Sequence, residues 1–191
     1  MSTNRLEAFS DAVLAIVITI MVLEIKIPEG EHFEDLNGML PSLITYVLSF
    51  IYLGIYWNNH HHLMHVAKKV NGRILWMNLH LLFWLSLFPF ATAYMGENHF
   101  QPIPTAFYGI VLLLASVSWS ILLQTMKKCD DASSKLHTFY GNKRKPRISM
   151  ALYCIGIVIS FIQPVLAGLI YILVAFMWFI PNKHLEELEQ S

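Results

Sequence analysis

The sequence predicts an all-α integral membrane protein, a single domain over residues 1–191 with six transmembrane helices. Two observations support this prediction. Hydrophobic residues make up 55% of the chain and charged residues only 14%, whereas ordinary soluble domains carry roughly a quarter charged residues. The apolar residues also form runs long enough to cross a hydrocarbon core of about 30 Å, which takes roughly 20 helical residues.

Six apolar runs define the expected spans. They cover residues 6–26, 40–58, 73–95, 104–126, 148–163 and 165–181. The last two are short and are separated only by Gln163 and Pro164, which we interpret as a tight turn, because proline disfavours helix at the preceding residue. The alternative is one broken helix over 148–181 and hence five spans. At about 1.5 Å per residue it would exceed the bilayer by about 20 Å.

Lysine and arginine fall almost entirely on one side of these spans. With the N-terminus inside, 12 of the 13 basic residues lie in cytoplasmic segments, and only Lys26 lies outside. Because basic loops are retained in the cytoplasm, we expect a multi-pass protein of the cell (plasma) membrane with both termini cytoplasmic. We expect no cleaved signal peptide, since the first apolar run contains Asp11 and no small-residue cleavage site follows it.

The first span carries a carboxylate, Asp11, at the head of the stretch SDAVLAIVITIM. In one interpretation, Ser10 or Asp11 caps the helix by accepting backbone N–H bonds, but the remaining helix would then be short for a span. In the other, the helix begins near Asn4 or Arg5 and Asp11 lies inside it. A carboxylate there needs partners on another span, because burial at mid-membrane costs roughly 2.5–3.5 kcal/mol.

The cytoplasmic end of the second span, YWNNHHHLMH, and the third span supply candidate partners for Asp11. These are Trp57, His60, His61 and Asn78. Indole and imidazole N–H groups are donors that suit a carboxylate, so we predict a structural hydrogen-bond network. A pH-sensing role and a metal site remain open alternatives, because His61 and His65 have the i, i+4 spacing that zinc sites can use.

An aliphatic stripe runs along the first span. Ile16, Ile20 and Leu23 follow i, i+4, i+7, and Thr19 lies beside them. Spacing alone favours a seam where this helix packs against another helix, with the Thr19 hydroxyl donating to the carbonyl of Ala15. The stripe by itself therefore indicates no particular function.

Several of these segments resemble the transmembrane-protein-175 family, the lysosomal and prokaryotic potassium channels. RLEAFSDAVLAIVITIMVLEIKIP is similar to the family's first-span signature, Arg-x-x-x-Phe-Ser-Asp, which here is Arg5, Phe9, Ser10 and Asp11. YWNNHHHLMH is similar to its Trp-x-x-His-His segment, and NLHLLFWLSLFPFATAYMGE resembles its third span. The resemblance covers the chain from end to end. One departure is PFATAYMGEN, where family members more often carry a second proline.

The resemblance implies an assembly and a permeation path. Prokaryotic members have one six-span repeat and form tetramers, so it implies a homotetramer with the first span lining a central pore. It further implies constricting rings of Ile16, Ile20 and Leu23 and a Thr19 ring that contacts potassium. Aliphatic rings gate by dewetting, and hydroxyl oxygens can replace part of an ion's hydration shell. The remaining motif residues would form the structural network: Arg5, Phe9, Ser10, Asp11, Trp57, His60, His61 and Asn78.

The expected function is a leak-like, potassium-permeable cation channel. Its partners would be further copies of itself, the lipid bilayer and potassium ions, with no cofactor, metal, catalytic residue or nucleic acid. Nothing in the sequence resembles the Thr-Val-Gly-Tyr-Gly filter of ordinary potassium channels, so we expect modest selectivity over sodium. A secondary transporter, or another proton- or cation-conducting membrane protein, is the alternative. A transporter would be expected to show paired repeats and broken helices, and a membrane enzyme would need a catalytic cluster that only the histidines could supply.

Overall fold

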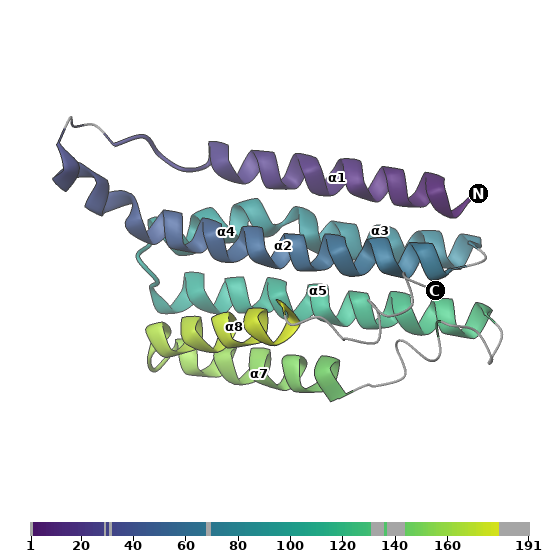
Figure 1. Cartoon of the computed structure of the whole chain (residues 1–191). Coiled ribbons are helices and arrows are strands. Elements are labelled where there is room, and N and C mark those ends of the chain that lie inside the picture. The colour runs from purple at the N-terminus through teal and green to yellow at the C-terminus, as the bar shows by residue number, and fades with distance from the viewer. Residues whose placement is uncertain are drawn as a thin grey trace.

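The computed structural model describes residues 2–28, 30, 32–67, 70–130, 136 and 144–179, and over these residues it contains helices and no strand. Figure 1 shows the helices lying side by side along one long axis. The elements are α1 (Thr3–Leu23), the 3₁₀ helix η1 (Phe33–Met39), α2 (Leu40–Val66), α3 (Gly72–Ser86), α4 (Phe88–Glu97), α5 (Pro102–Cys129), α7 (Arg144–Ser160) and α8 (Pro164–Phe179). The predicted all-α class is confirmed.

Four of the helical segments are long and apolar enough to cross a membrane. These are α1, η1 with α2, α3 with α4, and α5. The remaining pair, α7 and α8, is shorter, with 17 and 16 residues. The six segments correspond in order to the six apolar runs of the sequence.

The segment predicted as one span over 73–95 is two helices, α3 and α4, that meet at Leu87. The physical reason is Pro89, which has no N–H to donate to the carbonyl four residues earlier. The chain turns there through a bond from the Leu87 N–H to the Trp84 carbonyl at 3.3 Å. Helix α2, in contrast, continues to Val66. The histidine-rich segment therefore lies within this helix, beyond residue 58, the predicted end of the second span.

The helices α7 and α8 form an antiparallel pair joined by a short turn at Phe161–Gln163. The five-span alternative, with one broken helix over 148–181, is therefore wrong. The pair and α5 pack around Tyr171, which is fully buried. A Cβ atom added at either Gly109 or Gly156 would overlap the Tyr171 ring. The two glycines therefore let α5 and α7 approach the tyrosine closely.

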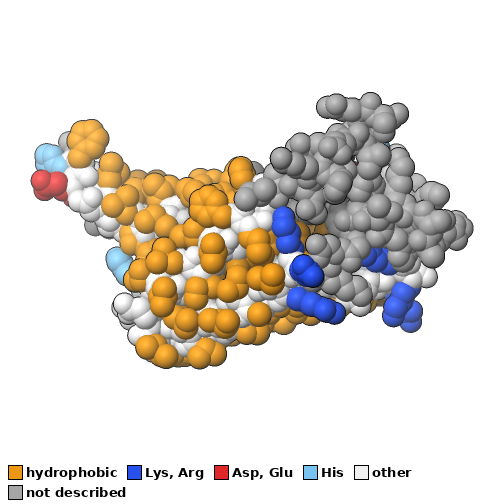
Figure 2. Space-filling view, turned by 60° about the horizontal axis from the view of Figure 1, so that its bottom comes forward, with side chains coloured by type: hydrophobic (Ala, Val, Ile, Leu, Met, Phe, Trp, Pro, Cys, Tyr) orange, Lys and Arg blue, Asp and Glu red, His pale blue; other side chains and the backbone are white. Residues whose placement is uncertain are grey.

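The side of the bundle is largely apolar, whereas charged side chains gather at its ends (Figure 2). Every described lysine and arginine except Lys26 lies in the half of the bundle that holds the start of α1, the start of α7 and the end of α5. The opposite end carries Glu24, Glu34, Asp35 and Glu97, with η1 projecting beyond the other helices. This distribution suits a protein that spans a bilayer.

Candidate functional site: the exposed face of helix α1

Helix α1 lies at the edge of the molecule (Figure 1). Only one of its faces is buried. The buried residues are Leu6, Ser10, Leu14, Val17 and Met21. They recur every three or four positions, as expected for one face of an α-helix, and they pack against α2, α3 and α4. The opposite face of α1 is exposed.

The predicted aliphatic stripe lies on this exposed face. Ile16 is 57% exposed, Ile20 40% and Leu23 80%. The stripe is therefore not a packing seam inside one chain, which was the interpretation that spacing alone favoured. An apolar face left open on a membrane helix must meet lipid, a pore or another protein surface.

Thr19 lies on the exposed side of α1, next to the stripe. Its hydroxyl donates to the carbonyl of Ile16 at 2.9 Å, not to that of Ala15 as the spacing suggested. A hydroxyl has one donor and two acceptor lone pairs. The Thr19 oxygen can therefore still accept from water or contact a cation while its proton is held by the backbone.

Behind the exposed face, a buried hydrogen-bond network joins α1, α2 and α3. The Asn78 amide nitrogen donates to the Ser10 hydroxyl at 2.9 Å, and this hydroxyl donates to the Leu6 carbonyl at 2.9 Å. The Asn78 amide oxygen lies 2.8 Å from Nε2 of His60. Because this oxygen can only accept, Nε2 carries the proton. The network thus ties the buried face of α1 to α2 and α3.

Other residues predicted for the network lie around it without joining it. Asp11 is half-buried, and its Oδ1 atom is buried with no hydrogen-bond partner in the described part of the chain. Arg5 is exposed and Phe9 is 48% exposed. Among the described residues, the structure thus joins Ser10, and not Asp11, to the donors on the neighbouring helices.

His61 belongs to a separate, exposed cluster near the end of α2. Its Nδ1 atom lies 2.7 Å from a carboxylate oxygen of Glu7. The rings of Trp57 and His65 stack on either side of His61, each with a centroid separation of 6.4 Å. Sequence reasoning missed Glu7, which precedes His61 by 54 positions, and no local pattern signals such a pair. In the described ranges no three His, Cys, Asp or Glu side chains are placed to hold a metal ion.

A groove of about 630 Å³ runs between α1 and α4, and two residues of the stripe line it. Its α1 wall includes Val13, Val17 and Glu24 as well as the stripe residues Ile16 and Ile20. The opposite wall consists of Ser86, Pro89, Phe90, Ala93, Tyr94, Glu97 and Asn98. No sequence pattern predicts this groove, because it depends on how α4 is placed against α1.

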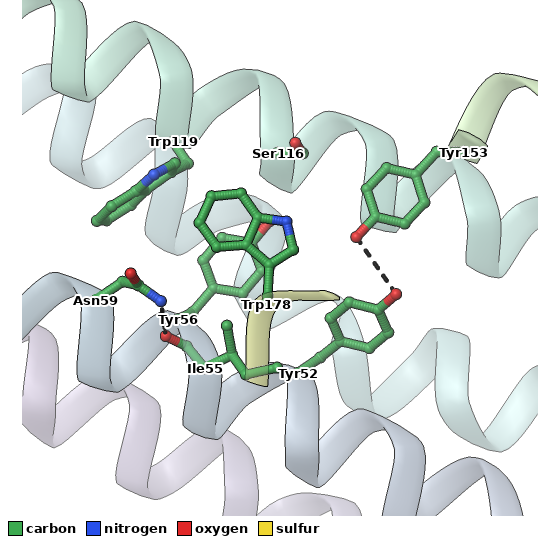
Figure 3. A pocket seen from close by; sticks show the side chains of 8 residues that line it. All are labelled: Tyr52, Ile55, Tyr56, Asn59, Ser116, Trp119, Tyr153 and Trp178. Atoms are coloured by element: carbon green, nitrogen blue, oxygen red, sulfur yellow. Dashed lines mark hydrogen bonds between the residues drawn. The ribbon is translucent and has the colours of Figure 1, made fainter. Parts of the chain in front are cut away.

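A second cavity lies away from α1, among α2, α5, α7 and α8 (Figure 3). It measures about 20 Å³ and is lined mainly by aromatic side chains, among them Tyr56, Trp119 and Trp178. The Tyr153 hydroxyl donates to that of Tyr52 at 3.3 Å along one wall. A mostly apolar space of this size offers no continuous path for ions.

Comparison with known proteins identifies relatives over the whole chain. The family model described as Endosomal/lysosomal potassium channel TMEM175 matches residues 5–89. A protein of Chryseobacterium sp. (strain P1-3) that is named a potassium channel is 52% identical over 98% of this chain and 97% of its own length. A Danio rerio protein named an endosomal/lysosomal proton channel is 25% identical over 65% of this chain and 24% of its own length. The chain thus spans about a quarter of that animal relative.

A solved structure shares the fold described above. It is the crystal structure of a lysosomal potassium-selective channel TMEM175 homolog from Chamaesiphon minutus, with a TM-score of 0.78 and 27% sequence identity. The match covers 92% of this chain and 95% of that chain. The similarity therefore extends well beyond the first three spans.

Proposed function

The chain belongs to the TMEM175 family of membrane ion channels, which are not enzymes, and from this premise we propose that it forms a potassium-permeable cation channel. Four copies would surround one axis, as closed cyclic homo-oligomers do, with α1 innermost. The observation that supports this most directly is the exposed stripe of α1, which stays uncovered in a single chain although the opposite face of the same helix is fully packed.

The exposed face of α1 has the chemistry that such a pore needs. Rings of Ile16, Ile20 and Leu23 around an axis would form a neck that empties of water when it narrows. A ring of Thr19 hydroxyls between them would offer oxygen atoms to a partly dehydrated ion. Because this supplies fewer ligands than a filter lined with carbonyls, the selectivity for potassium over sodium would be modest.

The buried network of Ser10, Asn78 and His60 would hold α1 in the rotation that points the stripe at the axis. Each of these side chains is at most 1% exposed, so the network is sealed from the pore. Its role would be structural, and it would act on permeation only through the position of α1. Arg5, Phe9, Asp11, Trp57 and His61 would complete this support at the same end of the bundle.

We further propose that the protein lies in the cell membrane with both termini cytoplasmic. The support is the gathering of the described basic residues, Lys26 excepted, at the end that holds the start of α1, since basic segments are retained on the cytoplasmic side. The last residues of the chain, including Lys183, lie outside the described part.

Purified protein in liposomes tests the proposed function. We expect potassium flux that exceeds sodium flux, little flux of N-methylglucamine, and a mass in detergent equal to four chains. Single-channel steps in a planar bilayer would exclude a secondary transporter, whose turnover does not produce them. A stable monomer as the only species, or a tetramer without cation flux, would contradict the proposal.

Proton conduction is a second candidate. The cluster of Glu7, His61 and His65 favours it, because chains of carboxylate and imidazole side chains can relay protons in membrane proteins. A pH gradient across the same liposomes, followed with an internal dye, distinguishes the two. A proton channel would dissipate the gradient in a potassium-free buffer that contains a permeant anion to compensate the charge of the protons.

A further inference from the structure

Helix α7 lies on the opposite side of the molecule from α1 (Figure 1). It packs chiefly against α5 and α8. Because the proposed channel has α1 innermost, this arrangement would put α7 on the outside of the assembly, where its exposed face meets lipid. In the proposed orientation, the start of α7 would lie on the cytoplasmic side of the membrane.

The exposed face of α7 has a basic end and an apolar remainder. Arg144 and Arg147 are exposed in its first turn, and the exposed positions after them include Ile148, Ala151, Ile155 and Val158. These positions recur every three or four residues, so they share one side of the helix. Figure 2, in which this side of the bundle is turned forward, shows basic side chains gathered where the apolar surface ends. The face thus has charge at one end and hydrocarbon along the rest, as a phospholipid does.

The charge of this part of the chain has one sign only. Residues 144–179, which form α7, the turn and α8, contain three basic residues, Arg144, Lys145 and Arg147, and no aspartate or glutamate. Elsewhere on the proposed cytoplasmic side, Arg5 is the only lysine or arginine of α1, and Arg73 is the only one of α3. The start of α7 therefore carries a denser basic cluster than the starts of these two helices.

Helix α7 is also short for a membrane span. Its 17 residues extend about 25 Å at about 1.5 Å per residue, whereas the hydrocarbon core is about 30 Å thick. Arg147 lies three residues inside the helix, about 4.5 Å further from the cytoplasm than Arg144. A basic side chain at the edge of the hydrocarbon needs an anionic or polar partner there, and a lipid phosphate lies close to this depth.

The first turn of α7 is held in place by α8. The Trp178 indole N–H donates to the Ser149 hydroxyl at 2.8 Å, and this hydroxyl donates to the Lys145 carbonyl at 2.9 Å. Ser149 is buried, so this bracing lies behind the exposed face. Arg147 therefore projects from a fixed backbone. Ala151, one turn further along the same face, leaves room for an acyl chain against the helix.

We infer that the exposed face of α7 binds an anionic phospholipid of the cytoplasmic leaflet. Arg147, with Arg144 beside it, holds the phosphate, because the guanidinium fork matches the geometry of two phosphate oxygens. One acyl chain lies along Ile148, Ala151 and Ile155. Anionic lipids of the cytoplasmic leaflet attract such basic clusters. The inference rests on the proposed channel and its orientation, and it adds a lipid site far from the ion path.

Native mass spectrometry of the purified assembly in detergent tests the site. We expect phosphatidylglycerol to bind at one molecule per chain, and phosphatidylcholine with the same acyl chains to bind at least about fivefold more weakly. Arg147→Gln should weaken the binding of phosphatidylglycerol about fivefold, the factor expected for one basic residue near an anionic surface. The matched control is Arg73→Gln, which removes the same charge from the start of α3 and should leave the affinity unchanged.

Two further measurements separate a lipid site from other causes. Arg147→Lys should restore part of the affinity that Arg147→Gln loses, because the charge returns without the fork. No recovery would contradict the inference, since the loss would then come from a change in fold. Inorganic phosphate at millimolar concentration should not displace the lipid. Displacement would show an anion site that does not recognise the acyl chains.

The outcomes separate the lipid site from the channel. Equal binding of phosphatidylglycerol and phosphatidylcholine by the parent would overturn the site, while a tetramer with potassium flux would leave the proposed channel standing. Equal losses from Arg147→Gln and Arg73→Gln would also overturn it, because they would show only a general attraction between charges.

Discussion

Two exposed apolar surfaces of the molecule, one on α1 and one on α8, differ in composition although they are similar in exposure. Ile16 on α1 is 57% exposed, and Leu169 on α8 is 55% exposed. The exposed face of α8 is built from large aliphatic and aromatic residues. The exposed face of α1 mixes aliphatic residues with Ala12, Ala15 and Thr19.

The interior behind each surface also differs. Behind α1 is a polar network that joins three helices through Ser10, Asn78 and His60. Behind α8, Tyr171 packs against two glycines, and its hydroxyl donates to the Thr105 carbonyl at 3.4 Å. Exposure therefore does not distinguish a lipid-facing surface from a pore-facing one. The presence of small and hydroxyl side chains, and the anchoring that fixes the orientation of the helix, are more informative.

The largest expected effect is a loss of stability when the hydrogen bonds that hold α1 to α2 and α3 are removed. Asn78→Ala removes the partner of two buried groups, on Ser10 and His60, at a cost of about 1–3 kcal/mol for each. We expect a clear fall in thermal stability in detergent and in the yield of tetramer. The control is Ser160→Ala, because the buried Ser160 hydroxyl donates only to Ile157 of its own helix. Equal losses from both variants would show that the network does not anchor α1 specifically.

The next effect concerns the stripe. Ile16→Asn should raise potassium flux by about tenfold, because the amide binds water in the constriction and lowers the barrier to ion passage. A tenfold rise corresponds to a barrier lower by about 1.4 kcal/mol. Leu169→Asn adds the same group at nearly equal exposure and should not raise flux. Liposome flux per assembled tetramer is the measurement. If Ile16→Asn forms tetramers that conduct no better than the parent, the constriction lies elsewhere.

A smaller effect is expected at Thr19. Thr19→Ala removes the exposed hydroxyl and should lower the preference for potassium over sodium by about twofold, or about 0.4 kcal/mol, without raising total flux. Ser86→Ala is the control, because Ser86 is also exposed and donates to its own helix, at the Phe83 carbonyl. Reversal potentials under mixed potassium and sodium measure the preference. An identical preference in the parent and in Thr19→Ala would remove Thr19 from the ion path.

The smallest effect is electrostatic. Glu24 directly follows the stripe, so four copies would place a ring of carboxylates at the mouth of the pore, and such rings attract cations. Glu24→Gln should reduce current at low salt by less than about twofold and leave it unchanged at high salt, because salt screens exposed charges beyond about 3 Å at 1 M. Glu34→Gln, out on η1, should have no effect at either concentration.

A change of current in the opposite direction is expected when a positive charge is removed at the same end of the pore. Lys26 pairs with Glu97 at 2.8 Å, so Lys26→Gln would leave Glu97 uncompensated and should raise low-salt current slightly. An unchanged low-salt current with Lys26→Gln would show that the charges at this mouth do not act on the permeating ion.

Much of the fold could be predicted from the sequence, because apolar runs of sufficient length must be membrane helices. Pro89 marked an interruption in the third predicted span, but the sequence did not show that the helix ends at Leu87, because a proline can either kink a helix or end one. The length of α2 was also underestimated. Its polar end, with Asn59 and four histidines, is less hydrophobic than a membrane span and yet continues as helix to Val66.

The candidate site was predicted less completely. Spacing placed Ile16, Ile20 and Leu23 on one face but gave no means to tell an exposed stripe from a buried one. Ser10 and Asp11 are neighbours in the sequence, and we predicted that the Asp11 carboxylate accepts the hydrogen bonds from neighbouring helices because it is charged. The hydrogen bonds found in the structure instead join Ser10 to Asn78. Which of two adjacent polar residues points at a neighbouring helix depends on helix rotation, and packing sets that rotation.

The sequence by itself determined that the protein is a membrane protein, that it is helical and to which family it belongs. These conclusions rest on hydropathy and on the motif around Arg5 and Asp11, which are local properties of the chain. Only the tertiary structure decided that the α1 stripe is open, that His61 meets Glu7, and that a groove lies beside Ile20. These features depend on residues far apart in the chain, whose relative positions follow from how the helices pack. Local pattern carries no information about such distances.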